Sequence, residues 1–499
     1  MKRTSLTTAV IAGLAGVAGI ANMAGAVNLS TDGTGSVLIY PYYTVNGNNV
    51  TLLSVVNTTS EGKAVKVRFL EAYNSREVLD FNLYMSPFDV WTAEVDPVTS
   101  TGGASISTGD NSCTVPTISG SVPFVNYAYS GNNSDTGPTD LSRTTEGYVE
   151  MIEMGTVNDN TSGSLTAITH VNGVPASCGQ VLAAWAITGG SAAYWTNNSS
   201  IDIGAPDGGL FGSGTIVNVG AGTIEGYNAD AVEGFYAGAS ANQHTAPGNV
   251  LPNLASGTNP TAFTFNTTGT GNVTLATTTF SSSIDAVSAV FMTDSIYNEY
   301  VVDPAYGEST EWVITFPTKR FYVDPQIIGS SAVHPFDEVF GSVSARPGTS
   351  CSPVSIVPYN REEATTPITA PPIGFSPPPP GTNPNIPVLC WETNVITFNE
   401  DGTVPSTVLG SSRNLNVNLP TGFIAGWVNL GFDDQSATTP VHNIVGSSNA
   451  NTFQGLPATG FSVEQTINSN VSGGVLANYT GLYNHKYNRV CGNGGGACS

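Results

Sequence analysis

Basic residues are scarce in this sequence. Its 499 residues include 14 Lys and Arg against 37 Asp and Glu, and the formal net charge at pH 7 is −23. Binding to phosphate groups requires clustered cations, so this scarcity excludes nucleic acid as a partner and disfavours anionic lipid surfaces. Charged residues of both signs make up only 10% of the chain, whereas hydrophobic residues make up 40% and include 20 Phe and 19 Tyr. These proportions exclude a disordered chain and are typical of an extracellular β-protein.

Long hydrophobic runs are also missing. The one extended apolar stretch, residues 8–20, is interrupted by three glycines and is too short to span about 30 Å of hydrocarbon. Lys2 and Arg3 precede it, and small residues end it at position 26. Residues 1–26 therefore predict a cleaved secretory signal, and we expect a mature chain without a transmembrane helix. Removal of the two cations leaves a net charge of −25, and the expected location is secreted, periplasmic or on the cell surface.

Motifs for nucleophilic and metal chemistry are lacking. The sequence has no G-x-S-x-G elbow, no C-x-x-C pair and no H-x-x-x-H pair. The histidines are scattered, and we interpret all five as solvated or structural: His170, His244, His334, His442 and His485. We predict no catalytic residue and no cofactor.

Paired acids are the remaining route to catalysis, because glycoside hydrolysis needs two carboxylates that converge on one sugar. Glu150 and Glu153 are three residues apart in a strand-like segment, as are Glu308 and Glu311. Residues at that spacing on a strand point to opposite faces, so neither pair should meet over one substrate. The sequence therefore predicts a protein that is not an enzyme, with glycosidase as the least unfavourable enzyme class.

Six cysteines remain after signal cleavage, and an even number in an exported chain favours disulfides. Six cysteines allow 15 pairings. Order along the chain suggests three bridges: Cys113 with Cys178, Cys351 with Cys390, and Cys491 with Cys498.

Structural calcium is compatible with several acidic residues in Gly- or Asn-rich surroundings, namely Asp32, Asp230 and the pair Asp433-Asp434. No complete D-x-D-x-D-G loop is present, so the ligands cannot be assigned from the sequence.

Residues 65–69 show period-two alternation, with Val65, Val67 and Phe69 on one face and Lys66 and Arg68 on the other. This pattern predicts a half-buried strand. Further strand segments with turn residues between them follow, which favours all-β architecture: sandwich-like antiparallel sheets with long loops and a few short helices.

Composition divides the mature chain into four parts. Residues 27–142 form an N-terminal sandwich portion with a long loop, in which residues 122–129 are the one clear apolar patch. Residues 143–350 form a second β-rich portion, with short helices expected at 180–187 and 229–237. Residues 351–390 form a proline-rich loop bounded by a disulfide, and residues 391–499 form a C-terminal β portion packed with the second.

Several phrases resemble uncharacterised secreted or cell-surface proteins of Gram-negative bacteria. They lie at residues 37–44, 53–58, 65–69, 77–83 and 86–91, and at 311–323 around the Thr-Phe-Pro-Thr-Lys-Arg run. The resemblance implies an exported β-rich architecture and no assigned activity.

These observations lead to the expectation of an exported structural or adhesive protein that acts by binding or assembly, with itself or a cell-surface polysaccharide or protein as partner. The alternative is a carbohydrate-binding or carbohydrate-active module. Tyr40, Tyr42, Tyr43 and Trp91 either form a sugar-stacking platform or fill a sandwich core. An exposed strand edge would favour assembly, whereas a deep pocket would favour a ligand.

Overall fold

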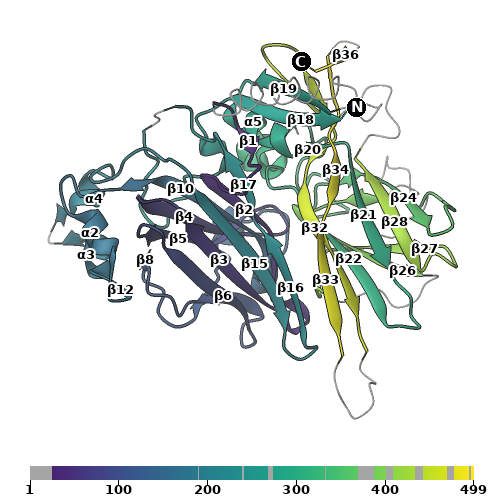
Figure 1. Cartoon of the computed structure of the whole chain (residues 1–499), viewed down its shortest axis with the longest axis horizontal. Coiled ribbons are helices and arrows are strands. Elements are labelled where there is room, and N and C mark those ends of the chain that lie inside the picture. Colours follow the sequence, from purple (N-terminus) through teal and green to yellow (C-terminus); the bar gives the residue numbers. More distant parts are fainter. Residues whose placement is uncertain are drawn as a thin grey trace, which may run out of the picture.

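The computed structural model describes residues 25–188, 190–238, 241–267, 273–331, 333–368, 387–400, 408–432, 442–468, 477–493 and 496–498. Strands in antiparallel sheets dominate these residues, and the helices are few and short, so the all-β prediction is confirmed. Two sandwiches lie side by side (Figure 1). The predicted signal at 1–26 falls almost wholly outside the described residues. Among the described residues, no helix has the length and hydropathy that a membrane crossing requires.

Two large sheets face each other in the first sandwich. The seven-stranded sheet has the spatial order β1 (Asn28–Leu29), β17 (Asp230–Glu233), β2 (Val37–Thr44), β10 (Glu146–Val157), β4 (Gly62–Glu71), β5 (Glu77–Met85) and β8 (Cys113–Val115). The six-stranded sheet has the order β16 (Thr223–Asn228), β15 (Leu210–Asn218), β3 (Val50–Asn57), β6 (Val90–Val98), β7 (Gly103–Ser107) and β9 (Val122–Pro123). The predicted boundary at residue 142 is therefore wrong, because β10, β15, β16 and β17 complete sheets that earlier strands begin.

The second sandwich contains a five-stranded and a four-stranded sheet. The first has the order β27 (Asn414–Leu419), β26 (Thr393–Glu400), β22 (Glu308–Thr315), β32 (Thr459–Thr466) and β33 (Tyr479–Asn484). The second has the order β24 (Ser355–Asn360), β28 (Ala425–Gly431), β21 (Ser295–Val301) and β34 (Lys486–Asn488). Strand β24 lies inside the predicted loop 351–390, so this part of the segment belongs to a sheet. Most of the proline tract lies outside the described residues.

The remaining strands form smaller sheets. They are formed by β18 (Thr261–Thr267) with β19 (Val273–Thr279), β20 (Met292–Thr293) with β31 (Leu456–Pro457), β23 (Ser352–Pro353) with β25 (Val388–Leu389), β11 (His170–Val171) with β12 (Val174–Pro175), β13 (Ile187–Thr188) with β14 (Ser191–Ala192), and β29 (Asn443–Val445), β30 (Thr452–Gln454), β35 (Cys491–Asn493) and β36 (Gly496–Ala497).

The hydrophobic core continues from one sandwich into the other. Phe461 of β32 stacks on Tyr227 of β16 with ring centroids 5.0 Å apart, and it contacts Tyr42 of β2 edge-on at 6.5 Å. The Thr315 hydroxyl of β22 donates to the Pro41 carbonyl at 2.6 Å. Because core side chains of both sandwiches form one buried cluster, the two sandwiches pack as a unit.

Helices occupy the margins of the sheets. α2 (Ser164–Ile168), α3 (Cys178–Ala183) and α4 (Tyr194–Asn197) form a small lobe at one end of the first sandwich (Figure 1). The helix predicted at 180–187 appears as α3 but ends earlier, and the segment predicted as a helix at 229–237 contains strand β17 instead, because its apolar residues pair with β2. α5 (Ser283–Phe291) packs against β18, β31 and β1, and it is capped by Ser282, whose hydroxyl accepts from the Asp285 amide. The remaining α-helices of the described residues are α6 (Arg320–Val323) and α7 (Pro325–Ile328).

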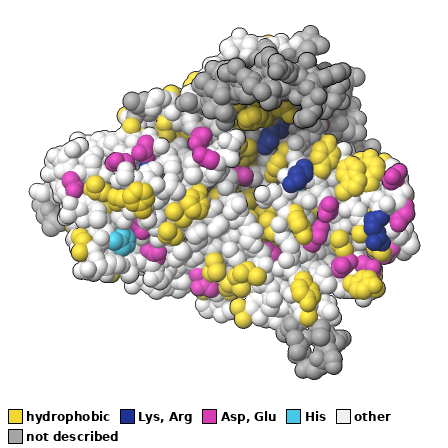
Figure 2. Space-filling view, in the orientation of Figure 1, with side chains coloured by type: hydrophobic (Ala, Val, Ile, Leu, Met, Phe, Trp, Pro, Cys, Tyr) yellow, Lys and Arg dark blue, Asp and Glu magenta, His cyan; other side chains and the backbone are white. Residues whose placement is uncertain are grey.

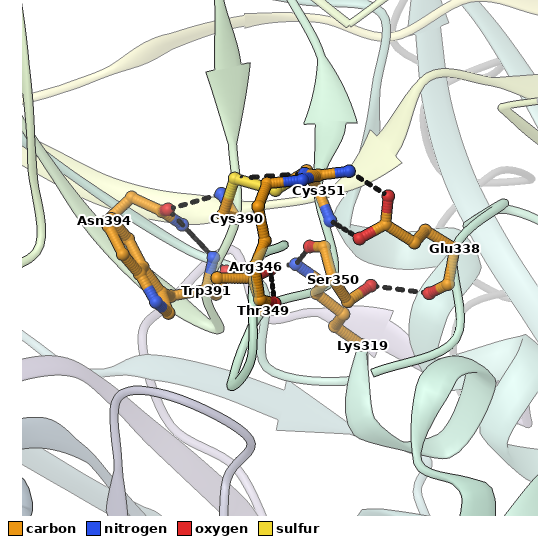
Figure 3. Close-up of a disulfide and its surroundings, with 9 residues drawn as sticks. All are labelled: Lys319, Glu338, Arg346, Thr349, Ser350, Cys351, Cys390, Trp391 and Asn394. Carbon is orange, nitrogen blue, oxygen red and sulfur yellow. Dashed lines mark hydrogen bonds and ion pairs between the residues drawn. A yellow bond between two sulfur atoms is a disulfide. The ribbon is translucent and has the colours of Figure 1, made fainter. Parts of the chain in front are cut away.

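All six cysteines are paired in the order that their positions suggest. The bridges join Cys113 to Cys178, Cys351 to Cys390 and Cys491 to Cys498. Figure 3 shows the surroundings of the second bridge, where the Asn394 side chain accepts from the amide of Cys390 at 3.1 Å. Three disulfides are compatible with an extracellular or periplasmic location.

Strand β4 shows the predicted alternation but is not half-buried. Val65, Val67 and Phe69 point into the core between the two large sheets. Lys66 and Arg68 lie on the other face, yet both are buried as well, with Lys66 at 0% and Arg68 at 3% exposure. Parts of the chain far away in sequence cover this charged face, and it becomes the floor of the groove described next.

Candidate functional site

A groove of about 590 Å³ opens over the outer face of the seven-stranded sheet. Strands β4, β5 and β10 supply its floor, residues 125–133 and 248–253 supply two of its sides, and α6 and α7 close another. It therefore brings together five regions of sequence that lie between Arg68 and Ile327. The volume lies within the range of small-molecule sites.

The floor is built around Arg68. Its guanidinium donates to Glu150 of β10 at 2.5 Å and to Glu77 of β5 at 2.8 Å. Burial would lower the pKa of Arg68, but the two carboxylates outweigh burial and raise it. Burial raises the pKa of Glu150, and Arg68 offsets part of that effect. The guanidinium thus stays charged and holds both acids in place.

A second ion pair extends the floor toward the edge of the sheet. The Lys66 ammonium lies 2.8 Å from Asp80 of β5, and Asp80 also accepts from the Gly248 amide at 3.0 Å. Burial lowers the pKa of Lys66, while Asp80 opposes this shift. The Gly248 contact attaches the covering loop to the floor.

Two more arginines meet at the wall formed by α6 and α7: Arg320 of α6, and Arg76 of the turn between β4 and β5. Asp324 pairs with Arg76 at 3.0 Å and with Arg320 at 3.0 Å, and it caps α7 by accepting from the Gln326 amide. Arg320 also donates to the Ser75 carbonyl at 3.0 Å. The wall is therefore fixed to the residues that link β4 to β5.

Behind this wall lies a buried charge cluster, which we define as Glu71, Arg76, Asp135, Arg143 and Asp324. Arg143 is fully buried and contacts Glu71 through Nε at 2.7 Å and Nη2 at 2.9 Å. It contacts Asp135 through both terminal nitrogens at 2.7 Å. Asp135 in turn lies 3.8 Å from Arg76 of the groove wall. The cluster thus connects the η4 turn (Leu141–Thr145), the end of β4 and the helices of the second sandwich.

Apolar side chains surround the mouth of the groove. Tyr127 is 76% exposed, and Val125, Val250 and Ile327 are exposed as well. In the face shown in Figure 2, exposed hydrophobic side chains form small separate groups among small polar residues, and Lys and Arg are sparse. The groove is therefore locally rich in basic residues, because three arginines line it in a chain that has only 14 Lys and Arg.

No protein-family model, no curated protein and no solved structure matches the chain. The resemblance to secreted and cell-surface proteins of Gram-negative bacteria therefore stays a prediction.

The acidic pairs singled out in the sequence separate in the structure. Glu150 binds Arg68, whereas Glu153 lies 3.1 Å from Lys63. Glu311 accepts from the Leu409 amide at 2.8 Å, while Glu308 lies nearer the end of β22 and is part-exposed. The groove instead combines Glu150 with Glu77, a pair that the sequence analysis did not consider.

Of the two interpretations of the four aromatic residues, a sugar-stacking platform is wrong and burial in the core is confirmed. Tyr40, Tyr42, Tyr43 and Trp91 are all 0% exposed and fill the core of the first sandwich. The exposed aromatic at the groove is Tyr127, which lies within the apolar patch 122–129 noted in the sequence. An apolar patch inside a Ser-, Gly- and Asn-rich segment was the available signal.

Two histidines have clear structural roles. His244 Nδ1 pairs with the Ser199 carbonyl at 2.7 Å and its Nε2 with the Tyr84 hydroxyl at 2.9 Å. His485 pairs with the Val313 carbonyl at 3.1 Å and with the Asn298 side chain at 3.0 Å. Burial lowers the pKa of His244 to about 4 and that of His485 to about 3, so both rings are neutral at pH 7.

The calcium candidates do not converge where they are described. Asp32 accepts from Ser30 and Thr34 of its own turn, and Asp230 contacts Thr459 of β32. Among the described residues, no three His, Cys, Asp or Glu side chains form a group that could hold a metal ion. Asp433-Asp434 lies outside the described residues, so structural calcium stays a prediction.

A buried carboxyl near the second disulfide leads to a pH prediction. Glu392 is 0% exposed, and burial raises its pKa from 4.5 to about 8, although Lys319 opposes the shift. Lys319 donates to the carbonyls of Ser350 and Trp391 at 2.6 and 3.2 Å (Figure 3). Between pH 4.5 and 8 the folded protein holds a proton that the unfolded chain releases, so this group reduces stability as pH rises.

Glu392→Gln should therefore stabilise the protein at pH 7 by about 1–3 kcal/mol and have an effect below about 1 kcal/mol at pH 5. Urea unfolding of the variant and of the wild type at both pH values measures this difference. The exposed Glu362→Gln serves as the control and should change stability little at either pH. An equal effect of Glu392→Gln at pH 5 and pH 7 would contradict the assigned titration.

Proposed function

We propose that the protein is an exported adhesive protein that acts by binding, and that the groove holds a neutral saccharide chain of a cell surface. The observation that supports this proposal is the combination of a floor with paired charges and a mouth with exposed apolar side chains. The ion pairs of the floor and wall offer donors and acceptors without a net local charge, because four cations balance four carboxylates: Arg68, Lys66, Arg76 and Arg320 with Glu77, Glu150, Asp80 and Asp324. A sugar presents hydroxyl groups toward such a floor and an apolar ring face toward Tyr127.

The net charge supports the choice of a neutral ligand. At −23 for the whole chain, long-range repulsion acts against polyanions such as uronic acid polymers. The cations that could offset this repulsion in the groove are already paired with Glu77, Glu150 and Asp324.

Assembly through the strand edges of the first sandwich has less support. The seven-stranded sheet ends in β1 and β8, which have two and three residues. The six-stranded sheet ends in the two-residue β9 on one side. On its other side, the Thr480 hydroxyl of β33 binds the Ile224 carbonyl of β16 at 2.8 Å. Short or covered edges resist edge-to-edge pairing.

Binding without turnover is part of the proposal. An inverting or retaining glycosidase needs one carboxyl group that donates a proton and a second that acts as base or nucleophile. In the groove, Glu77 and Glu150 both pair with the Arg68 guanidinium, at 2.8 and 2.5 Å. Each carboxylate is thus engaged in an ion pair, an arrangement that positions a ligand and leaves neither group free to act separately as acid or base.

Binding of neutral oligosaccharides, measured by calorimetry against a panel that includes oligouronates, tests the proposal. Tyr127→Ala should weaken the binding of a neutral ligand by about fivefold, because a lost ring contact is worth about 1 kcal/mol. Tyr306→Ala is the matched control, since Tyr306 is 68% exposed and does not line the groove. Absence of binding across the panel, or an equal loss in both variants, would contradict the proposal.

A further inference from the structure

Lys63, the second residue of β4, is fully buried beside two carboxylates. Its Nζ atom is in direct contact with Asp207 Oδ1 and lies 3.1 Å from Glu153 Oε1. Lys63 and Glu153 are both 0% exposed, whereas the Asp207 side chain is 43% exposed. Glu153 belongs to β10, the strand next to β4, and Asp207 lies in the loop that leads into β15.

Glu153 holds the loop of Asp207 against the lysine. Its carboxylate accepts from the backbone amide of Asp207 at 3.1 Å and from that of Gly208 at 2.7 Å. The same Oε1 atom that accepts from Lys63 accepts from Asp207, so the amine and the Asp207 carboxyl are oriented by one group. A nucleophile held against the carboxyl group that it attacks has most of its orientation entropy already removed.

The raised pKa of Glu153 suits a group that carries protons between the lysine and the aspartate. Burial raises the pKa of Glu153, and Lys63 and the Gly208 amide offset part of the shift. A carboxyl whose pKa is raised toward neutrality can both accept and return a proton at working pH.

We propose that Lys63 and Asp207 form an intramolecular isopeptide bond, with Glu153 as the proton carrier. The Lys63 ammonium transfers a proton through Glu153 to the Asp207 carboxylate, which leaves a neutral amine and a neutral carboxyl group. The amine nitrogen then attacks Asp207 Cγ, the Cγ–Oδ bond breaks, and the oxygen leaves as water after it receives the second amine proton through Glu153. The net change is one ammonium and one carboxylate converted to one amide and one water, with no oxidant or co-reactant.

The position of the bond would have a mechanical consequence. Lys63 belongs to the seven-stranded sheet and Asp207 precedes a strand of the six-stranded sheet, and they are 144 residues apart in the chain. An amide at this place would tie the two sheets of the first sandwich together covalently. This inference does not depend on the saccharide proposal, although a cross-linked sandwich would suit a protein that bears load at a surface.

Peptide mapping of the mature wild-type protein tests the proposal. After reduction, denaturation and digestion with trypsin and chymotrypsin, tandem mass spectrometry should find one branched peptide that joins position 63 to position 207 and is lighter by one water than its two parts. Trypsin should cleave after Lys66, the internal control, and not after Lys63. Complete cleavage after Lys63 would overturn the proposal.

Loss of water by itself is not sufficient, because Asp207 precedes Gly208 and this dipeptide can close to a succinimide with the same loss of mass. A succinimide would leave Lys63 open to trypsin and give no branched peptide, which would also overturn the proposal.

Two variants test the chemistry. Asp207→Asn should form the same amide with loss of ammonia in place of water, so its branched peptide should have the same mass as that of the wild type. Glu153→Gln keeps the size of the side chain but cannot carry a proton, so the branched peptide should be lost. A branched peptide of unchanged yield in Glu153→Gln would overturn the role of Glu153. If this variant does not fold, the wild-type map and Asp207→Asn still decide whether the bond forms.

Discussion

Replacement of Arg143 by alanine is expected to lower the free energy of unfolding by about 3–5 kcal/mol. Arg143 is the centre of the buried charge cluster and contacts two carboxylates, Glu71 and Asp135, which have side-chain exposures of 0% and 2%. Its removal leaves these acids in a buried position without their principal cation. Desolvation of such unpaired charges is far more costly than the loss of a surface ion pair.

Two further variants separate charge from geometry. Arg143→Lys retains the charge but cannot make paired contacts with both carboxylates, so it should lose about 2 kcal/mol. Arg361→Ala removes an exposed arginine and should change stability by about 0.5 kcal/mol or less. Urea unfolding followed by tryptophan fluorescence measures all three variants. A loss below about 1 kcal/mol for Arg143→Ala would show that the cluster contributes little net stability.

The same cluster should influence ligand binding. Asp135 lies between Arg143 and Arg76, and Arg76 lines the groove. Loss of Arg143 frees Asp135 to reposition the wall. We therefore expect the stability and the groove geometry to change together in Arg143→Ala.

Removal of the Cys113–Cys178 bridge is the second change with a large expected effect. The bridge connects β8, a three-residue edge strand, to α3 of the small helical lobe, across a separation of 65 residues. The chain-entropy model assigns about 4 kcal/mol to closure of a loop of this length. Cys113→Ser with Cys178→Ser should therefore destabilise the protein by about 4 kcal/mol and release the helical lobe first.

The third bridge provides a control of the same chemistry. Cys491 and Cys498 are separated by 7 residues, and closure of so short a loop is worth about 2.5 kcal/mol. Calorimetric unfolding of the two double variants should thus rank the first bridge above the third. The opposite order would mean that local contacts, and not loop closure, determine what each bridge contributes.

Local patterns in the sequence were sufficient to identify the all-β class and strand β4. The alternation of Val65, Val67 and Phe69 with charged residues identified β4. The cysteine order matched the three bridges. These features depend on neighbours a few residues away or on simple order along the chain, so single-sequence reasoning can recover them.

Local patterns failed where burial depends on distant segments. Lys66 and Arg68 gave β4 the appearance of a strand with one solvated face, but residues 246–248, β5 and β10 cover and neutralise that face. The segment 229–237 has good local features for a helix and is nevertheless drawn into the seven-stranded sheet as β17. Pairing with β2 satisfies its backbone and buries Val232, which outweighs local preference.

The sequence by itself determined the class of this protein: an acidic, disulfide-bonded, all-β chain. Composition and periodicity are sufficient for these properties, since each depends on sums or on short spacings. Tertiary structure alone decided the sites. The groove joins Arg68, Tyr127, Val250 and Ile327, and the proposed cross-link joins Lys63 to Asp207. Such contacts depend on how strands are ordered in two sheets, and in a β-fold that order is set by pairings between residues far apart in the chain.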